Sequence, residues 1–209
     1  MFDGYVLVGG KSGRMGADKA LLRLGNKTFA EIAVAAITEI AAGRVTFVVN
    51  KARDKQINSH LPVGVPQISD ALPDKAALGG IYTALADSKS EWTVVSACDY
   101  PFATKNLFAK FAEIAQSVSL QTAAIIPVQP DKRTQPLCAL YRAEICLPAA
   151  LGLLKEKEVL PARKLSENVS TRYIYFDELK NLSGSKFFFF NVNTPADYRQ
   201  AQKIYRKTL

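Results

Sequence analysis

A loop after the first apolar run of the chain has the residue types that bind phosphate groups. Residues 5–8 (Tyr-Val-Leu-Val) are suited to a buried strand, and four glycines follow: Gly9, Gly10, Gly13 and Gly16. Glycine lets the main chain approach a ligand closely, and successive exposed N–H groups form a concavity that binds anions. Basic side chains add full charges at Lys11, Arg14 and Lys19. The segment predicts a polyphosphate cradle, although composition alone also allows a glycine-rich surface loop.

Two familiar phosphate-binding loops do not account for this segment. A Walker A loop requires Gly-x-x-x-x-Gly-Lys-Ser/Thr. The triplet Gly10-Lys11-Ser12 supplies its ending, but Tyr5 occupies the position of the upstream glycine. The dinucleotide fingerprint Gly-x-Gly-x-x-Gly is also missing, because the loop contains no Gly-x-Gly.

A second candidate for chemistry is the acidic residue Asp99. It follows the apolar run 93–97, within Cys98-Asp99-Tyr100-Pro101-Phe102. A carboxylate at the carboxyl end of a central strand can hold Mg²⁺ while triphosphate oxygens and water complete the octahedron. Asp and Pro are also ordinary turn formers, so the segment alone leaves a simple turn open.

The loop as a whole, Leu-x-Gly-Gly-x-Ser-x-Arg-Met-Gly-x-Asp-Lys from residue 7 to residue 19, resembles the signature of the MobA-like nucleotidyltransferases. These enzymes attach a nucleotide to the molybdenum cofactor. Three further segments resemble the family pattern: Leu78-Gly79-Gly80, Cys98-Asp99-x-Pro101-Phe102 and Asn191-x-Asn193-Thr194-Pro195. Val8 and Ala77 depart from the alanine and proline usual in the family. The resemblance implies transfer of GMP from GTP to the terminal phosphate of molybdopterin, with release of pyrophosphate.

The resemblance also implies a set of site residues. The catalytic residues would be Lys19, Arg14 and Asp99, with Mg²⁺ on Asp99. The nucleotide would contact Leu7, Val8, Gly9, Gly10, Lys19, Asn50, Asp70, Leu78, Gly79 and Asp99. The acceptor would contact Lys132, Arg133, Arg142, Asn191 and Asn193, with Arg163 and Lys164 as further candidates. From the residues alone, Asn50 could be a turn residue and the basic side chains solvated surface charge.

Alternative activities remain open at this point. Gly9-Gly10 looks like the guanylyltransferase loop, since cytidylyltransferases tend to have alanine before the final glycine. A cytidylyl- or sugar-phosphate nucleotidyltransferase is the closest enzymatic alternative, and a non-catalytic GTP-binding regulatory module is a different class. Lys19 and Asp99 together favour an enzyme, because binding alone scarcely needs the metal carboxylate.

Composition narrows the partners. The formal charge of +8 favours anionic ligands, but the basic residues are dispersed, so we expect no nucleic acid. No run approaches the ~20 apolar residues of a membrane span, and the N-terminal residues lack the features of a signal peptide. The odd number of cysteines (Cys98, Cys138, Cys146) suggests small buried side chains in a reducing cytoplasm. The resemblance adds transient contact with proteins that deliver the cofactor or mature molybdoenzymes.

The predicted elements alternate between strands and helices. This order predicts one α/β domain over residues 1–209, with a mostly parallel sheet between helices on both faces. The resemblance implies the nucleotide-diphospho-sugar transferase type of this three-layer, Rossmann-like fold. The expected strands are 5–8, 45–49, 65–68, 93–97, 123–128, 138–142, 171–176 and 187–190. The expected helices are 28–43, 52–59, 78–85, one after Thr104, 144–154, 161–165 and one after Thr194. Ligands would bind beyond the carboxyl ends of the strands.

Overall fold

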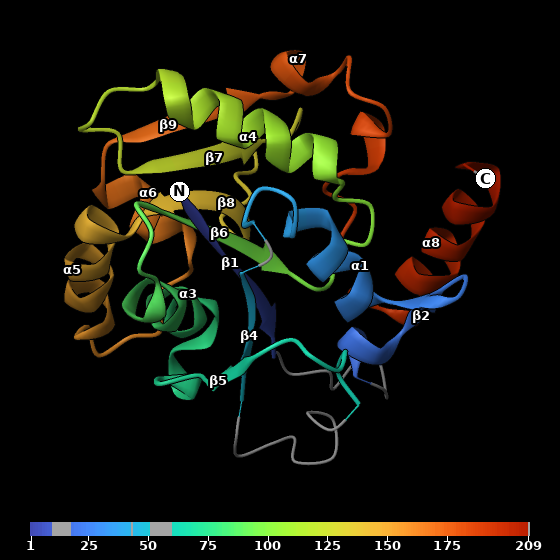
Figure 1. Ribbon diagram of the computed structural model, residues 1–209, viewed down its shortest axis with the longest axis horizontal. Coiled ribbons are helices and arrows are strands. Elements are labelled where there is room, and N and C mark those ends of the chain that lie inside the picture. Colours follow the sequence, from blue (N-terminus) through green and yellow to red (C-terminus); the bar gives the residue numbers. More distant parts are fainter. Residues whose placement is uncertain (10–17, 43, 51–59, 209) are drawn as a thin grey trace.

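The computed structural model describes residues 1–9, 18–42, 44–50 and 60–208, and a seven-stranded sheet runs through its centre (Figure 1). The strand order is β5-β4-β1-β6-β8-β7-β9. The bounds are β1 Phe2–Val8, β4 Val45–Val49, β5 Gln67–Ser69, β6 Trp92–Ala97, β7 Ala124–Val128, β8 Cys138–Arg142 and β9 Thr171–Tyr175. A small antiparallel pair, β2 Arg23–Leu24 and β3 Lys27–Thr28, lies apart from it. The predicted helix 52–59 and the predicted helix end at Gly43 fall outside the described residues.

All strands of the large sheet except β8 run in the same direction. The pairs β1–β4, β1–β6, β4–β5 and β7–β9 are parallel, whereas β8 is antiparallel to both β6 and β7. Within the β6–β8 pair Ser96 lies opposite Cys138, and Trp92 lies opposite Arg142. The loop between β7 and β8 therefore reaches the same edge of the sheet as the carboxyl ends of β1, β4, β5 and β6.

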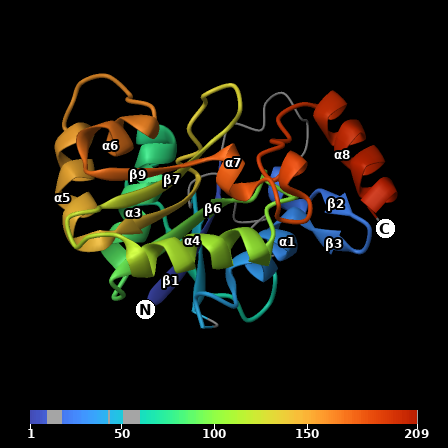
Figure 2. The ribbon, with the colours of Figure 1, turned by 90° about the horizontal axis from the view of Figure 1, so that it is seen from above.

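Helices cover both faces of the sheet, as the predicted three-layer arrangement requires (Figures 1 and 2). Helices α1 and α4 pack in one apolar cluster, and α3, α5 and α6 pack in the other. The bounds are α1 Phe29–Ile37, α3 Ala76–Asp87, α4 Lys105–Ser117, α5 Ala143–Leu154, α6 Arg163–Asn168, α7 Phe176–Leu179 and α8 Pro195–Thr208, with 3-10 turns η2 Lys19–Leu21, η3 Pro73–Lys75 and η4 Ser185–Phe187. None of the described helices combines the length and the apolar character needed to cross a membrane.

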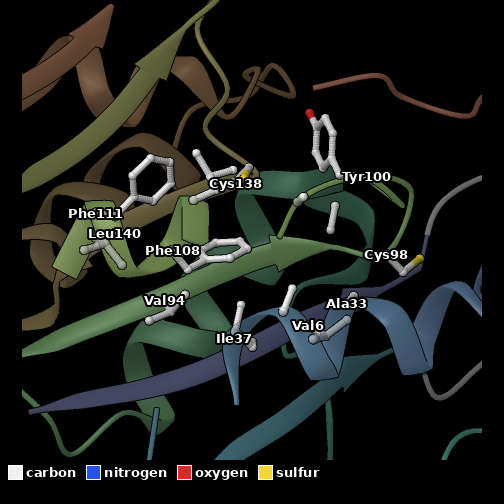
Figure 3. Close-up of a cluster of buried hydrophobic side chains, with 14 of the residues drawn as sticks. Val6, Ala33, Ile37, Val94, Cys98, Tyr100, Phe108, Phe111, Cys138 and Leu140 are labelled. Carbon is white, nitrogen blue, oxygen red and sulfur yellow. The ribbon is translucent and has the colours of Figure 1, made fainter. Parts of the chain in front are cut away.

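The central strands read as apolar runs because both of their faces are covered. Every residue of β6, β7 and β8 is buried. Figure 3 shows part of the cluster on the α1 and α4 side, where Val6, Ile37 and Phe108 lie among its side chains. All three cysteines are buried and free, which confirms their predicted role as small apolar side chains. Burial raises the pKa of the Cys146 thiol to about 12.

Local capping signals in the sequence are confirmed. Thr28 Oγ1 accepts from the Glu31 amide at 3.2 Å, and Glu31 Oε2 accepts from the Thr28 amide at 2.6 Å, which is the predicted capping box. Thr104 Oγ1 accepts from the amide of Leu107 at the start of α4, at 3.4 Å. Thr194 Oγ1 accepts from the amide of Asp197 in the first turn of α8, at 3.2 Å. These side chains satisfy donors that the first helical turn leaves unpaired.

The predicted strand over residues 187–190 is wrong. Residues Ser185–Phe187 form the 3-10 turn η4, and the following phenylalanines continue in a turn. Phe188 and Phe189 are both buried although they are adjacent, so the segment lacks the two-residue alternation of a strand with one exposed face. Phe102 packs against Phe187 and Phe190, each with ring centroids 6.0 Å apart. Phe188 and Phe189 pack in the apolar cluster on the α1 and α4 side, so this segment covers the sheet and does not extend it.

Candidate functional site

Three side chains from distant parts of the chain meet at the carboxyl edge of β6. Lys19 Nζ lies 3.1 Å from Asp99 Oδ2 and donates to Asn193 Oδ1 at 2.5 Å. The side chains of Lys19 and Asp99 are 20% and 17% exposed, so this ion pair is partly shielded from solvent. The structure thus brings together two of the predicted catalytic residues and one predicted acceptor residue.

Backbone hydrogen bonds fix the position of this junction. The Asp18 side chain caps the turn η2 by accepting from the Ala20 amide at 2.8 Å. This bond fixes the main chain from which the Lys19 side chain extends. The amide of Val192 donates to the Asp99 carbonyl at 3.0 Å. This bond holds Asn191 and Asn193 at the site. The sequence had instead predicted that a strand before them would position them.

A carboxylate on α8 holds the second asparagine in place. Asp197 Oδ2 accepts from the amides of Asn193 and Thr194, at 3.0 Å and 2.8 Å. Burial opposes ionisation of Asp197, but these two amides and the Thr194 side chain more than offset it, so the pKa of Asp197 lies below its ordinary value. An ionised Asp197 keeps the main chain of Asn193 turned so that its side chain meets Lys19.

Asp99 and the nearby Asn191 carry oxygens that could hold a cation. Burial raises the pKa of Asp99, against the opposing influence of the Lys19 ammonium and the Asn191 side chain. Asp99 Oδ1 and Asn191 Oδ1 are buried and have no hydrogen-bond partner in the part of the chain that the structure describes. Buried oxygens without a donor are uncommon, and carboxylate and amide oxygens are the ligands that Mg²⁺ takes. The residues present therefore fit a divalent cation.

The protein alone would supply only part of the shell of such a cation. Within residues 1–9, 18–42, 44–50 and 60–208, no group of three His, Cys, Asp or Glu side chains could enclose a metal ion. Mg²⁺ usually keeps several waters and takes one or two carboxylates together with substrate phosphates. The junction fits a cation that arrives with a polyphosphate, as the sequence predicted for Asp99.

A second group of predicted residues lies along the adjacent strand ends. Gly9, Asn50 and Asp70 directly follow β1, β4 and β5, which are neighbours in the sheet. A Cβ added to Gly9 would lie 3.9 Å from the Cβ of Asn50, so these two residues are in contact range. Leu7 and Val8 are 8% and 4% exposed and pack in the core. Only their main chain can reach a ligand at this edge.

The loop after β5 is locked to α3. Asp70 Oδ1 accepts from the Leu72 amide at 2.9 Å and from Thr83 Oγ1 at 3.2 Å. A Cβ on Gly79 would lie 2.2 Å from the Leu72 carbonyl oxygen, so only glycine fits there. Leu78 is 1% exposed and belongs to the core. Leu78 and Gly79 thus shape the loop, and the hydrogen bonds to Asp70 leave its other oxygen, Oδ2, for a ligand.

A large cavity lies on the other side of the Asn191 and Asn193 segment. Its volume is about 1230 Å³, and four of the predicted acceptor residues line it: Lys132, Arg133, Asn191 and Asn193. Arg163 lines it as well, whereas Lys164 does not and instead pairs with Glu167 at 2.6 Å. The sequence reasoning missed the other polar lining residues, which include Tyr100, Gln135, Lys186 and Asp197. Each of these stands within four positions of a predicted residue or beside the phenylalanine run, a signal that could have suggested them.

The acceptor-binding prediction for Arg142 is wrong. Because β8 is antiparallel to β6, Arg142 lies opposite Trp92, at the far edge of the sheet from Asp99. It is 6% exposed, donates through Nε to the Thr122 carbonyl at 3.0 Å, and forms an ion pair with Glu91. Its guanidinium carbon lies 4.4 Å from the centre of the Trp92 ring. Arg142 therefore stabilises the opposite edge. Two other predicted residues, Gly10 and Arg14, lie outside the described residues.

Comparisons with known proteins identify relatives of this chain in sequence and in fold. A probable molybdenum cofactor guanylyltransferase from Carboxydothermus hydrogenoformans is 30% identical over 203 residues, covering 96% of this chain and 94% of that protein. The crystal structure of molybdopterin-guanine dinucleotide biosynthesis protein A from Archaeoglobus fulgidus superposes with a TM-score of 0.77, at 24% identity, over 99% of this chain and 100% of that one. The 4-diphosphocytidyl-2C-methyl-D-erythritol synthase from Anaerococcus prevotii does so with a TM-score of 0.68, at 12% identity, over 98% and 96%.

The two solved structures confirm the predicted type of α/β fold, and the sequence comparison goes further. The profile of the MobA-like NTP transferase domain matches residues 4–171, which include every strand of the large sheet except the last four residues of β9 and part of β1. The predicted family resemblance is therefore confirmed: this chain belongs to the MobA-like NTP transferase family.

Proposed function

We propose that this protein transfers GMP from GTP to the terminal phosphate of molybdopterin, forming molybdopterin guanine dinucleotide and pyrophosphate. The observation that carries the proposal is the Lys19–Asp99–Asn193 junction, which connects two groups of predicted site residues. On one side are the strand ends bearing Gly9, Asn50 and Asp70, and on the other is the cationic cavity. The name of the Carboxydothermus relative supports the same reaction.

In this proposal the nucleoside binds along the carboxyl ends of β1, β4 and β5. The main chain of Leu7, Val8 and Gly9 forms one wall, and Asn50, Asp70 Oδ2 and the entrance of α3 form the other. Lys19 holds the triphosphate, with Gly10 and Arg14 as the family signature implies. Polar main-chain and side-chain groups at this edge of the sheet contact the base and so determine which base the protein accepts.

We propose Mg²⁺ as the cofactor, held by the Asp99 carboxylate with Asn191 Oδ1 beside it. Their two buried oxygens without donors support this assignment. When bound, Mg²⁺ would neutralise phosphate charge next to the scissile bond. Lys19 pairs with Asp99 in the structure. Its ammonium would therefore lie next to the same phosphate charge that Mg²⁺ neutralises.

Bringing two anions together is the main difficulty of the reaction. Two unit charges at about 4 Å repel by about 4 kcal/mol at an effective dielectric near 20. The acceptor phosphate already carries a nucleophilic oxygen, so the chain needs no general base. Its residues act by positioning and by neutralising charge: Lys19 and Arg14 on the donor, and Lys132 and Arg133 on the acceptor.

The proposal also covers the domain organisation, the location and the partner proteins of this chain. We propose that residues 1–209 act as one nucleotidyltransferase domain, because α8 packs with β2 and α1 in a shared apolar cluster through Ala201, Leu24 and Phe29. We place it in the cytoplasm, in keeping with three free buried thiols. Proteins that deliver the cofactor or mature molybdoenzymes would contact the mouth of the acceptor cavity transiently.

A cytidylyltransferase is the second candidate, because the Anaerococcus protein, whose name includes a diphosphocytidyl group, shares the fold. The discriminating experiment follows pyrophosphate release from GTP and, separately, from CTP, each with and without molybdopterin, in the presence of Mg²⁺. The proposal requires release that depends on molybdopterin. GTP binding without pyrophosphate release would favour a regulatory module instead.

A further inference from the structure

The acceptor cavity contains a buried amide whose orientation is fixed from behind. Gln135 is 8% exposed and lines the cavity, and its Oε1 accepts a hydrogen bond from the Tyr100 hydroxyl at 2.8 Å. Glutamine is seldom buried to this extent unless its polar atoms are engaged. The carbonyl end of the side chain is engaged by Tyr100, which leaves the two N–H donors of Nε2 to account for.

Those donors have no partner in the part of the chain that the structure describes. Among the described residues Gln135 Nε2 makes no hydrogen bond, yet it is not one of the fully buried atoms that lack one. It therefore faces the open space of the cavity. The Tyr100 hydroxyl is the donor of the bond to Oε1. A donor on Tyr100 holds the carbonyl of Gln135 toward itself and turns the NH₂ group outward.

The main chain around Gln135 is equally constrained. Its amide donates to the Pro127 carbonyl at 2.9 Å, and its carbonyl accepts from the Cys138 amide at 3.0 Å. In contrast, Lys132 and Arg133 are exposed, and Arg133 already pairs with Asp131 at 2.6 Å. The cavity thus combines exposed charges on Lys132 and Arg133 with one buried neutral donor on Gln135.

The position of Gln135 indicates which part of the acceptor it meets. Its partner Tyr100 directly follows Asp99, and Gln135 itself comes two positions after Arg133 in the basic loop. Gln135 therefore links the basic loop to the residue next to Asp99. An acceptor that occupies the cavity, which Arg133, Gln135 and Asn193 all line, would have this amide beside it. In Figure 3 the Tyr100 hydroxyl points away from the labelled apolar side chains.

We propose that Gln135, oriented by Tyr100, binds the acceptor phosphate as a fixed neutral donor. This inference rests on the proposed function and adds two residues that the sequence reasoning left out: Gln135 as a phosphate ligand and Tyr100 as its positioning residue. The Nε2 donors would take a non-reacting phosphate oxygen and leave another oxygen free to attack. A neutral donor binds the phosphate without competing with the cation for its charge.

The test measures steady-state KM for molybdopterin, KM for GTP and kcat in four variants of the full chain. Gln135→Ala should raise KM for molybdopterin about 10- to 100-fold, the range expected for one hydrogen bond to a charged group. Gln135→Glu should raise it further, because a carboxylate repels the phosphate. Tyr100→Phe should raise it about 3- to 10-fold, since the amide can then rotate. KM for GTP should stay within about twofold in all three.

Tyr141→Phe is the matched control. The Tyr141 hydroxyl donates to the carbonyl of Pro136, the next residue of the same loop, at 2.6 Å, and Tyr141 does not line the cavity. Tyr141→Phe and Tyr100→Phe should lower Tm to a similar extent, but only Tyr100→Phe should raise the acceptor KM. Equal acceptor KM values in wild type and the Gln135 variants would overturn the inference while leaving the function intact. Absence of turnover in the wild type would refute the proposed function, and this inference with it.

Discussion

At the scale of single residues, Lys19 is the contact that joins the donor and acceptor sides. It bonds to Asp99, at the end of a central strand, and to Asn193, on the wall of the acceptor cavity. The partial shielding of this ion pair makes it stronger than a surface pair. A phosphate that enters the site would compete with Asp99 for the Lys19 ammonium.

Replacing Lys19 should therefore affect both binding and turnover. Lys19→Ala is expected to raise KM for GTP and to lower kcat, together by about 100-fold or more in kcat/KM, because a charge that contacts the triphosphate is lost. Lys27→Ala, at an exposed position of β3, is the control and should behave as the wild type. Kinetics of Lys19→Ala that equal those of the control would remove Lys19 from the site.

Asp99 can be tested without changing its size. Asp99→Asn should reduce pyrophosphate release by about 100-fold or more, since the charge that would hold Mg²⁺ is lost. The fold should survive, because burial already opposes the ionised form of Asp99. Pyrophosphate release and circular dichroism give the two readouts. Full turnover in a folded Asp99→Asn variant would contradict the assignment of the cation site.

At the scale of elements, the entrance of α3 shows how packing shapes the nucleotide edge. Gly79 sits against the Leu72 carbonyl, and Asp70 holds the same loop through Leu72 and Thr83. The sequence predicted a ligand role for this glycine. The structure explains it first as a place where two backbone segments pass too closely for a side chain.

Gly79→Ala should consequently destabilise the protein. Its methyl group would meet backbone, which cannot rotate away, and we expect a loss of about 1–3 kcal/mol in the free energy of unfolding. Gly152→Ala is the matched control: it lies within α5 with nothing within 4 Å of the added Cβ, and should gain about 0.5–1 kcal/mol. Urea unfolding measures both. Equal stability of the two variants would show that the α3 loop tolerates a side chain.

Elements with local signals could be predicted, and those set by distant contacts could not. The capping box at Thr28 and the buried run of β6 depend on neighbours in the sequence, and both are confirmed. The aromatic run 187–190 looked like a strand because composition does not distinguish a buried strand from a buried turn that packs on the sheet. The direction of β8 also depends on its sheet neighbours, which is why Arg142 was assigned to the wrong edge.

At the scale of the whole molecule, the two edges of the sheet have different tasks. The carboxyl edge gathers the site residues, whereas the opposite edge carries a structural network around Asp3. Asp3 Oδ2 accepts from the amides of Lys89 and Ser90 at 2.8 Å and 2.9 Å, and Oδ1 pairs with Arg44 at 2.8 Å. Burial alone would raise the pKa of Asp3, but these partners lower it overall.

This network predicts a pH dependence of stability. The folded-state pKa of Asp3 lies below the unfolded value of about 3.9, so its contribution is present above that value and is lost as pH falls through the folded pKa. Asp3→Asn should cost about 1–3 kcal/mol at neutral pH and less near about pH 3.5. Asp177→Asn, at a side chain that is 84% exposed, is the control and should change little. Urea unfolding at both pH values gives the difference, which must shrink on acidification.

The site as a whole could be predicted in its list of residues but not in its layout. Gly9, Asn50, Asp70 and Asp99 do gather at one edge, as parallel strands require. The cavity beyond Asn193 is built from loops between β7 and β8 and around α6, η4 and α8, whose approach depends on tertiary packing. Their nearness in sequence to predicted residues could have suggested Gln135 and Tyr100, but their place in the cavity depends on this packing.

The central claim is guanylyl transfer, and a direct competition tests it. The full chain is incubated with molybdopterin, Mg²⁺ and equal concentrations of GTP and CTP, and mass spectrometry identifies the dinucleotide formed. Molybdopterin guanine dinucleotide as the dominant product is the expected result. Predominant formation of the cytosine dinucleotide, or consumption of neither nucleotide, would contradict the proposed function.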